Sequence, residues 1–202
     1  NTYGNNERYV VVTGGTFNTD VNHQYWAFEV KIDKTLAAKN NGDGTWTIVP
    51  AAAYVNETFS GYNRNAGYAT IEEAFAVAFA MGIEVVTVAK DCEMVGNVTV
   101  PTGKTVTLNL NGKTVVATDN ATGSYAMITN KGNLTIEGDG AIKLTATNNR
   151  GWNAYSSVIS NTVGGKLVVE NGTIEHLGGT DMAYAIDNLT NGKGTYAETV
   201  IN

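Results

Sequence analysis

The sequence has few of the residues that crosslink a chain, anchor it in a membrane or bind nucleic acid. Cys92 is its one cysteine, so no disulfide can form within the chain, and stability must come from packing and hydrogen bonds. No apolar run approaches the ~20 residues of a membrane-spanning helix. The 13 basic residues form no cluster and are outnumbered by 19 acidic ones. We therefore expect neither membrane insertion nor nucleic-acid binding.

Glycine, asparagine and threonine are what the chain has in abundance. The 23 glycines stand beside only 2 prolines, and 43% of the residues are hydrophobic. Glycine and asparagine adopt positive φ at low cost, so this composition favours short strands and tight turns around a core. The chain begins at Asn1 and stops at Asn202 within what reads as a repeat. We therefore expect a longer polypeptide, with any export signal elsewhere.

One template recurs three times in the C-terminal third. Segments 128–142 and 159–174 align as Ile, any residue, Asn, a glycine-bearing turn, Leu, any residue, a β-branched residue, Glu, a second glycine turn and Ile. A looser third copy begins at Ile186, and the first isoleucines of the copies are 31 and then 27 residues apart. Such a period is typical of solenoids, in which one coil is too small to bury its own apolar face. The sequence predicts an all-β fold, a parallel β-helix.

A single helix is predicted over residues 70–81. Thr70 is the expected N-cap, Glu73 completes a Thr-x-x-Glu capping box, and Gly82 provides the C-terminal stop. The helix has one apolar stripe, made of Ile71, Phe75, Ala78 and Phe79. Because strand-like runs follow directly, we expect this helix to cap the open end of the first coil.

The chain divides into two predicted parts near Gly67. Residues 1–67 are expected to form a β-rich N-terminal segment or the end of a preceding module, with residues 51–67 as a connection. Residues 68–202 are expected to form the β-helix with its capping helix, and the last coil is expected to continue beyond the sequence.

The motifs after residue 69 resemble a known family. The runs TIEEAFA (70–76), VVTV (85–88) and TVTLNLNGKT (105–114) are similar to the start of right-handed parallel β-helix domains of the pectin-lyase-like kind, especially those of large surface proteins of gut bacteria. The runs GGTF (14–17) and NGDGTWTI (41–48) resemble segments of the same surface proteins. The resemblance implies a right-handed coil. It leaves the function open, because this architecture carries polysaccharide-cleaving enzymes, adhesins and phage fibres.

Asn130, Asn161 and Asn188 occupy one template position, two residues after the isoleucine. If the coils stack, these residues form a structural ladder in which side-chain amides bond from coil to coil. The other interpretation is that each is an ordinary turn asparagine. Neither gives them a catalytic role.

Candidate catalytic and metal-binding residues are scattered in the sequence, and no catalytic residue, metal site or cofactor is predicted. Asn18-Thr19-Asp20 resembles a polygalacturonase tripeptide, but the further motifs of those enzymes are missing. Glu137 and Glu170 share one template position and are expected to be solvated. His23 and His176 lack ligand spacing, and Asn41-Gly42-Asp43-Gly44 reads as a hairpin turn instead of a calcium loop.

The insert between the first two template copies holds the candidate binding residues. Trp152 and Tyr155 lie there with Arg150 and Asn153. Aromatic rings beside amides can stack on sugars and bind their hydroxyls, and loops on a rigid scaffold often carry function. The alternative is an aromatic side chain that folds back on the coil.

Together these features predict a non-enzymatic extracellular module at a cell or virion surface. It would act as a rigid spacer that binds carbohydrate or a host or bacterial surface, and would stack on further β-helix coils of the same longer chain or of a neighbouring subunit. Two alternatives remain: a polysaccharide lyase or hydrolase of the pectin-lyase-like class, and a phage fibre or virion decoration protein.

Overall fold

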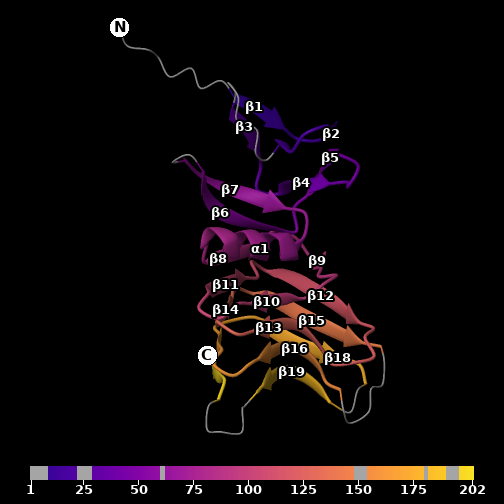
Figure 1. Ribbon diagram of the computed structural model, residues 1–202, viewed down its shortest axis with the longest axis vertical. Helices are drawn as coiled ribbons and strands as arrows, with labels where there is room; N and C mark the ends of the chain where they lie inside the picture. The colour runs from indigo at the N-terminus through magenta and orange to yellow at the C-terminus, as the bar shows by residue number, and fades with distance from the viewer. Residues whose placement is uncertain (1–8, 22–28, 60–61, 148–153, 180–181, 190–195) are drawn as a thin grey trace.

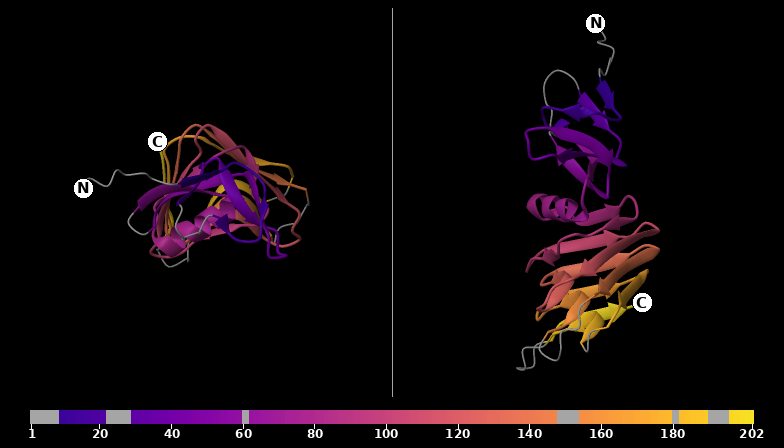
Figure 2. Two further views of the ribbon diagram at one scale, coloured as in Figure 1. Left: turned by 90° about the horizontal axis from the view of Figure 1, so that it is seen from above. Right: turned by 90° about the vertical axis from the view of Figure 1, so that its right-hand side faces the viewer.

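The computed structural model describes residues 9–21, 29–59, 62–147, 154–179, 182–189 and 196–202. Its main body is a parallel β-solenoid, in which successive coils stack below one helix (Figure 1). Viewed from above, the coils lie over one another, and the side view shows their strands layered from the helix downward (Figure 2). The predicted parallel β-helix with a capping helix is therefore confirmed.

Three sheets form the walls of the solenoid, and each complete coil contributes one strand to each wall. In spatial order the first wall is β20 (Glu198–Ile201), β17 (Lys166–Val169), β14 (Asn133–Glu137), β11 (Thr105–Asn109), β8 (Val85–Val88), β6 (Ala53–Phe59) and β7 (Tyr62–Tyr68). The second is β18 (Thr173–Leu177), β15 (Gly140–Ala146), β12 (Lys113–Asp119) and β9 (Cys92–Glu93). The third is β10 (Val98–Val100), β13 (Tyr125–Asn130), β16 (Ser156–Asn161) and β19 (Ala183–Asn188).

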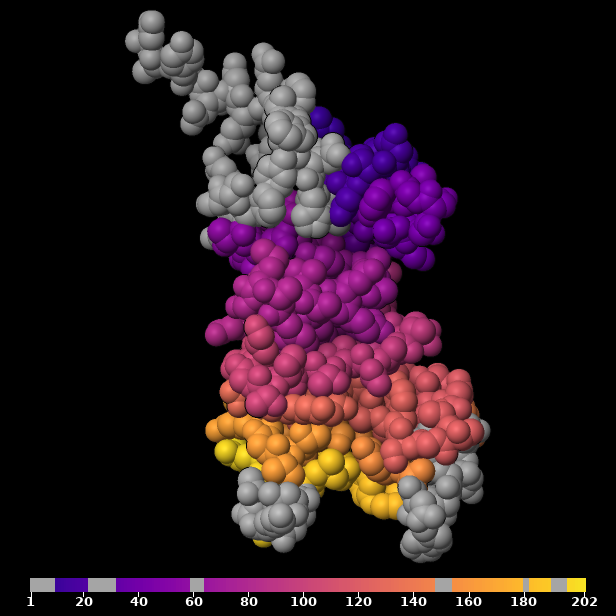
Figure 3. Space-filling view, in the orientation of Figure 1, coloured from indigo at the N-terminus to yellow at the C-terminus, as the bar shows by residue number. Residues whose placement is uncertain are grey.

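Apolar columns fill the space between the walls. Ile128 pairs in parallel register with Ile159, and Ile159 pairs with Ile186. The side chains of Ile128 and Ile159 are fully buried. Leucine, valine and isoleucine columns repeat this arrangement on the other two walls, for example at Val106, Leu134 and Leu167. Sequence neighbours consequently form successive bands on the surface, seen as layers of colour in Figure 3.

Helix α1 (Ile71–Met81) covers the top of the stack. Both hydrogen bonds of the Thr70–Glu73 capping box are present, and Gly82 ends the helix with φ 69°. Ile71, Phe75 and Ala78 are buried as predicted, and they belong to the same core cluster as the first coil. Outside this apolar contact, the Gly96 N–H donates to Glu72 Oε1 at 2.8 Å.

Lys104 supplies the cation that the last turn of α1 lacks. Its Nζ donates to the carbonyl of Phe79 at 2.8 Å, and the helix has no basic residue of its own in that turn. We expect Lys104→Met to lower the free energy of unfolding by about 1 kcal/mol, because one charge-assisted hydrogen bond is lost. Chemical denaturation measures the change. Lys131→Met, at an exposed lysine of the next coil, is the control, and an equal loss in both variants would contradict the role of Lys104.

The top of the first wall differs from the sequence interpretation. Residues 51–67 were expected to be a connection, yet β6 and β7 form an antiparallel hairpin, and β6 pairs with β8. The hairpin thus extends a wall of the solenoid. Gly67 lies against the N-terminal segment, since an added Cβ would sit 2.1 Å from the carbonyl oxygen of Leu36.

The N-terminal segment has two small sheets. β1 (Tyr9–Val12) and β3 (Glu29–Ile32) pair in parallel, and β5 (Trp46–Pro50) pairs antiparallel with β2 (Thr16–Phe17) and β4 (Leu36–Asn40). Residues 41–44 turn from β4 into β5. There Asp43 Oδ1 accepts hydrogen bonds from the Thr45 side chain and backbone, which lower the pKa of Asp43. This geometry is the predicted hairpin turn.

Candidate functional site

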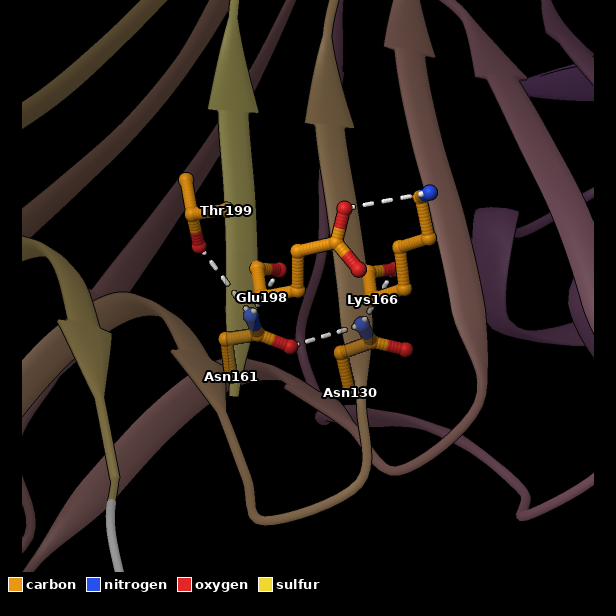
Figure 4. A network of polar contacts seen from close by, with 5 residues as sticks. All are labelled: Asn130, Asn161, Lys166, Glu198 and Thr199. Atoms are coloured by element: carbon orange, nitrogen blue, oxygen red, sulfur yellow. Dashed lines mark hydrogen bonds and ion pairs between the residues drawn. The ribbon is translucent and has the colours of Figure 1, made fainter. Parts of the chain in front are cut away.

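The Asn ladder links three successive coils at one turn of the solenoid. Asn130 Nδ2 donates to Asn161 Oδ1 at 2.9 Å, and Asn161 Nδ2 donates to Asn188 Oδ1 at 3.0 Å. Two of the amides also reach the first-wall strand of the coil below, where Asn130 Nδ2 donates to the Lys166 carbonyl and Asn161 Nδ2 donates to the Glu198 carbonyl (Figure 4). Because Asn130 and Asn161 are fully buried, their role is to satisfy turn backbone groups.

An exposed ion pair lies beside the ladder on the outer face of the first wall. Lys166 and Glu198 occupy paired positions on β17 and β20, with Nζ and Oε1 3.1 Å apart. Both side chains are about half exposed, so the pair contributes little to stability. Figure 4 shows this exposed pair beside the buried amides.

At the opposite corner the second wall passes into the third, and the insert with the predicted binding residues falls between the strands of these walls in the sequence. Arg150, Trp152 and Asn153 lie outside the described residues, and Tyr155 is half-buried. The Tyr155 N–H donates to Ser124 Oγ at 3.3 Å, and its carbonyl accepts from the Tyr125 N–H at 2.9 Å. The backbone of Tyr155 is therefore fixed against the coil above.

Tyr125 belongs to the same corner, one coil higher. Its hydroxyl donates to the Gly96 carbonyl at 3.1 Å, and burial is the main cause of the raised pKa of this phenol. Asn120 contributes an amide oxygen, which accepts a hydrogen bond from Thr147 at 2.6 Å. We name Asn120, Tyr125, Thr147 and Tyr155 the tyrosine corner.

A polar trio with two buried members and a half-buried histidine lies beneath the tyrosine corner. Ser156 Oγ is 2.6 Å from Asp119 Oδ2 and 2.9 Å from His176 Nε2. Asp119 and Ser156 are fully buried, and the Ala121 N–H also donates to the Asp119 carboxylate. Sequence reasoning missed this trio, because its members are separated by 37 and 20 residues and no local motif joins them.

The trio contains the residue types of a serine hydrolase but not their arrangement. The Ser156 proton is donated to Asp119, so His176 Nε2 must donate to Ser156 Oγ and cannot take that proton as a base. Ser156 is also inaccessible to a substrate. The trio therefore holds three strands together at the corner, with the buried carboxylate satisfied by hydrogen bonds.

The carboxylates of Glu137, Glu170 and Glu175 lie on outer faces of the coils. Asn109 Nδ2 donates to Glu137 at 2.7 Å, and Asn202 Nδ2 donates to Glu170 at 2.8 Å. Glu175 pairs with Lys143 at 2.8 Å, on the strand face opposite to the neighbouring His176. Each carboxylate thus has its own neutral or cationic partner.

A second buried charge lies in the hairpin of the first wall. Glu57, only 1% exposed, accepts from Arg64 Nε at 2.6 Å and from the Tyr68 hydroxyl at 3.1 Å. Burial, and next the Glu57 charge, raise the pKa of Tyr68. The cluster joins β6 to β7 and leaves the carboxylate no open side.

The described residues offer few groups for metal or thiol chemistry. Among them, no three His, Cys, Asp or Glu side chains gather as metal ligands. Burial raises the pKa of Cys92 to about 11, so its thiol stays protonated at neutral pH. No helix in the described part of the chain is long and apolar enough to span a bilayer.

Comparison with protein-family models, with curated proteins and with solved structures finds no match to this chain.

Proposed function

We propose that this chain is a non-enzymatic module of an extracellular surface or fibre protein, related to pectin-lyase-like repeat domains, and that it serves as a stiff spacer. The observation that carries the proposal is the unbroken registration of coils, in which the isoleucine column and the Asn ladder repeat through three successive coils. Each coil contacts mainly its neighbours, so length can grow by repetition.

Stiffness follows from how the coils are joined. Every wall is a parallel ladder of backbone hydrogen bonds, and bending the stack would open ladders on one side and compress the apolar columns on the other. The buried amides of Asn130 and Asn161 oppose sliding between coils, because a shift of one residue would leave them unpaired. A spacer needs this resistance.

We further propose that the spacer contacts a neutral glycan at the tyrosine corner. Tyr125 and Tyr155 lie on adjacent coils with the amide of Asn120 nearby. Phenol rings and amides are groups that bind sugar rings and hydroxyls. Trp152, outside the described residues, belongs to the same insert in the sequence.

Glycan-array binding tests the contact. We expect the wild type to bind, and Tyr155→Ala and Trp152→Ala each to weaken binding about tenfold, the effect of losing about 1.4 kcal/mol of stacking. Tyr196→Ala is the matched control, because Tyr196 is 70% exposed and lies outside the tyrosine corner. Absence of binding, or an equal loss in the control, would overturn the proposed glycan contact, and only the spacer function would remain.

The enzymatic alternative has its own measurement. Incubation with acidic and neutral polysaccharides should leave the solution viscosity unchanged, because Asp119 and Ser156 are buried and their hydrogen bonds with His176 are wrongly ordered for catalysis. A fall in viscosity that Asp119→Asn abolishes would overturn the non-enzymatic assignment.

A further inference from the structure

Three Asn-Gly pairs lie in the described part of the chain, at residues 41–42, 111–112 and 171–172. Such pairs can lose ammonia without an enzyme. The glycine nitrogen attacks the asparagine side-chain carbonyl carbon, the amide leaves as ammonia, and a cyclic succinimide forms. Water then opens the ring to aspartate or isoaspartate. Glycine favours the attack because it has no Cβ to block the approach.

The first two pairs are restrained at both reacting groups. Asn41 Nδ2 donates to the hydroxyls of Thr45 and Thr47, each at 2.9 Å, and the Gly42 N–H donates to Asn40 Oδ1 at 2.8 Å. Each of these hydrogen bonds must break before the glycine nitrogen can reach the side chain. The pair at the β4–β5 turn is therefore protected.

The pair at residues 111–112 is held in the same way by neighbouring coils. Asn111 Nδ2 donates to the Val88 carbonyl at 3.1 Å, and the Gly112 N–H donates to the Asp139 carbonyl at 2.5 Å. Asn111 also sits at φ 51°, a backbone conformation that these contacts stabilise. Attack would need a turn clamped between two coils to open.

The third pair lacks these restraints. Asn171 is exposed, and in the described part of the chain neither its side chain nor the Gly172 N–H makes a hydrogen bond. The turn lies against the one above, since a Cβ on Gly172 would be 3.2 Å from the Gly138 carbonyl oxygen. The register of Thr173 with Ala141 places Asn171 below Asp139.

We propose that Asn171 is a site of spontaneous deamidation in the folded protein, and that the coil contacts protect Asn111 and Asn41. The product carries a new carboxylate directly below that of Asp139, where two like charges on adjacent coils repel. The net charge changes from −6 to −7. The modification thus adds a negative charge at one defined turn of the stack.

Peptide mapping by mass spectrometry tests the proposal on the full chain kept folded in mildly alkaline buffer. Fragment spectra must separate residue 171 from the Asn191-Gly192 pair, which lies outside the described residues. We expect the initial rate at Asn171 to exceed the rates at Asn111 and Asn41 by at least about tenfold, since two hydrogen bonds restrain the Asn111-Gly112 pair and three restrain the Asn41-Gly42 pair. Asn171→Gln should remove the product.

Chain unfolded in denaturant is the reference, because there all Asn-Gly pairs should react at similar rates. Protection of Asn111 and Asn41 relative to this reference, without protection of Asn171, supports the assignment. Equal rates at the three sites in the folded chain, or protection of Asn171 as strong as that of Asn111, would overturn it.

Discussion

Ile159→Asp is expected to abolish the cooperative fold of the lower coils. Ile159 is fully buried, and it pairs with Ile128 in the coil above and with Ile186 in the coil below. It belongs to the apolar core cluster of the solenoid. An aspartate there loses the burial of the isoleucine and places an unpaired charge in the core, a combined cost above about 4 kcal/mol. Denaturant unfolding followed by circular dichroism measures it.

Thr145→Asp is the matched control, since Thr145 is an exposed outer position of β15. We expect this variant to unfold within about 0.5 kcal/mol of the wild type. A wild-type midpoint for Ile159→Asp would contradict the in-register isoleucine column, whereas equal destabilisation of both variants would indicate a general intolerance of charge on the coils.

The solenoid was predictable because its information is periodic. The template at residues 128–142 and 159–174 repeats the positions of core isoleucine, turn glycine and ladder asparagine, so alignment of the sequence with itself gives the register that the strands adopt. The helix was predictable for a local reason, since Thr70, Glu73 and Gly82 mark its two ends. Both signals can be read without tertiary contacts.

The hairpin of residues 53–68 was not predictable from such signals. Its pairing with β8 is antiparallel and occurs once, so no repeated sequence pattern predicts it. The buried carboxylate of Glu57, paired with the partly exposed Arg64, also breaks the alternation that marks a half-buried strand, because a charge takes a core-facing position. Only the contact between the strands compensates that charge.

The polar sites show the same difference between repeated features, which the sequence predicts, and contacts that occur once, which it does not. The spacing predicted that Asn130, Asn161 and Asn188 share a column, and hydrogen bonds link these residues. The trio at the other corner depends on His176, which takes the position paired with the buried Leu144 in the coil above. This substitution of a polar residue within an apolar column identifies a buried network only once Asp119 is known to lie nearby.

The second large effect is expected for Asn161→Leu. Asn161 is the central ladder residue, with donors to Asn188 Oδ1, the Glu198 carbonyl and Thr199 Oγ1, and an acceptor for Asn130. Leucine is similar in size but leaves the buried Asn130 amide without its acceptor and the Glu198 carbonyl without its donor, which costs about 3 kcal/mol. Thermal and denaturant unfolding measure the loss.

Asn188→Leu separates the ladder from ordinary turn preference. Asn188 has the same template position but an exposed side chain, and the Asn161 amide that donates to it keeps the Glu198 carbonyl as an acceptor. The expected cost is therefore below about 1 kcal/mol. A turn preference for asparagine would make the two substitutions equally harmful. A cost at Asn161 several times that at Asn188 would instead locate the stabilisation in the buried amide-to-amide hydrogen bonds that join one coil to the next.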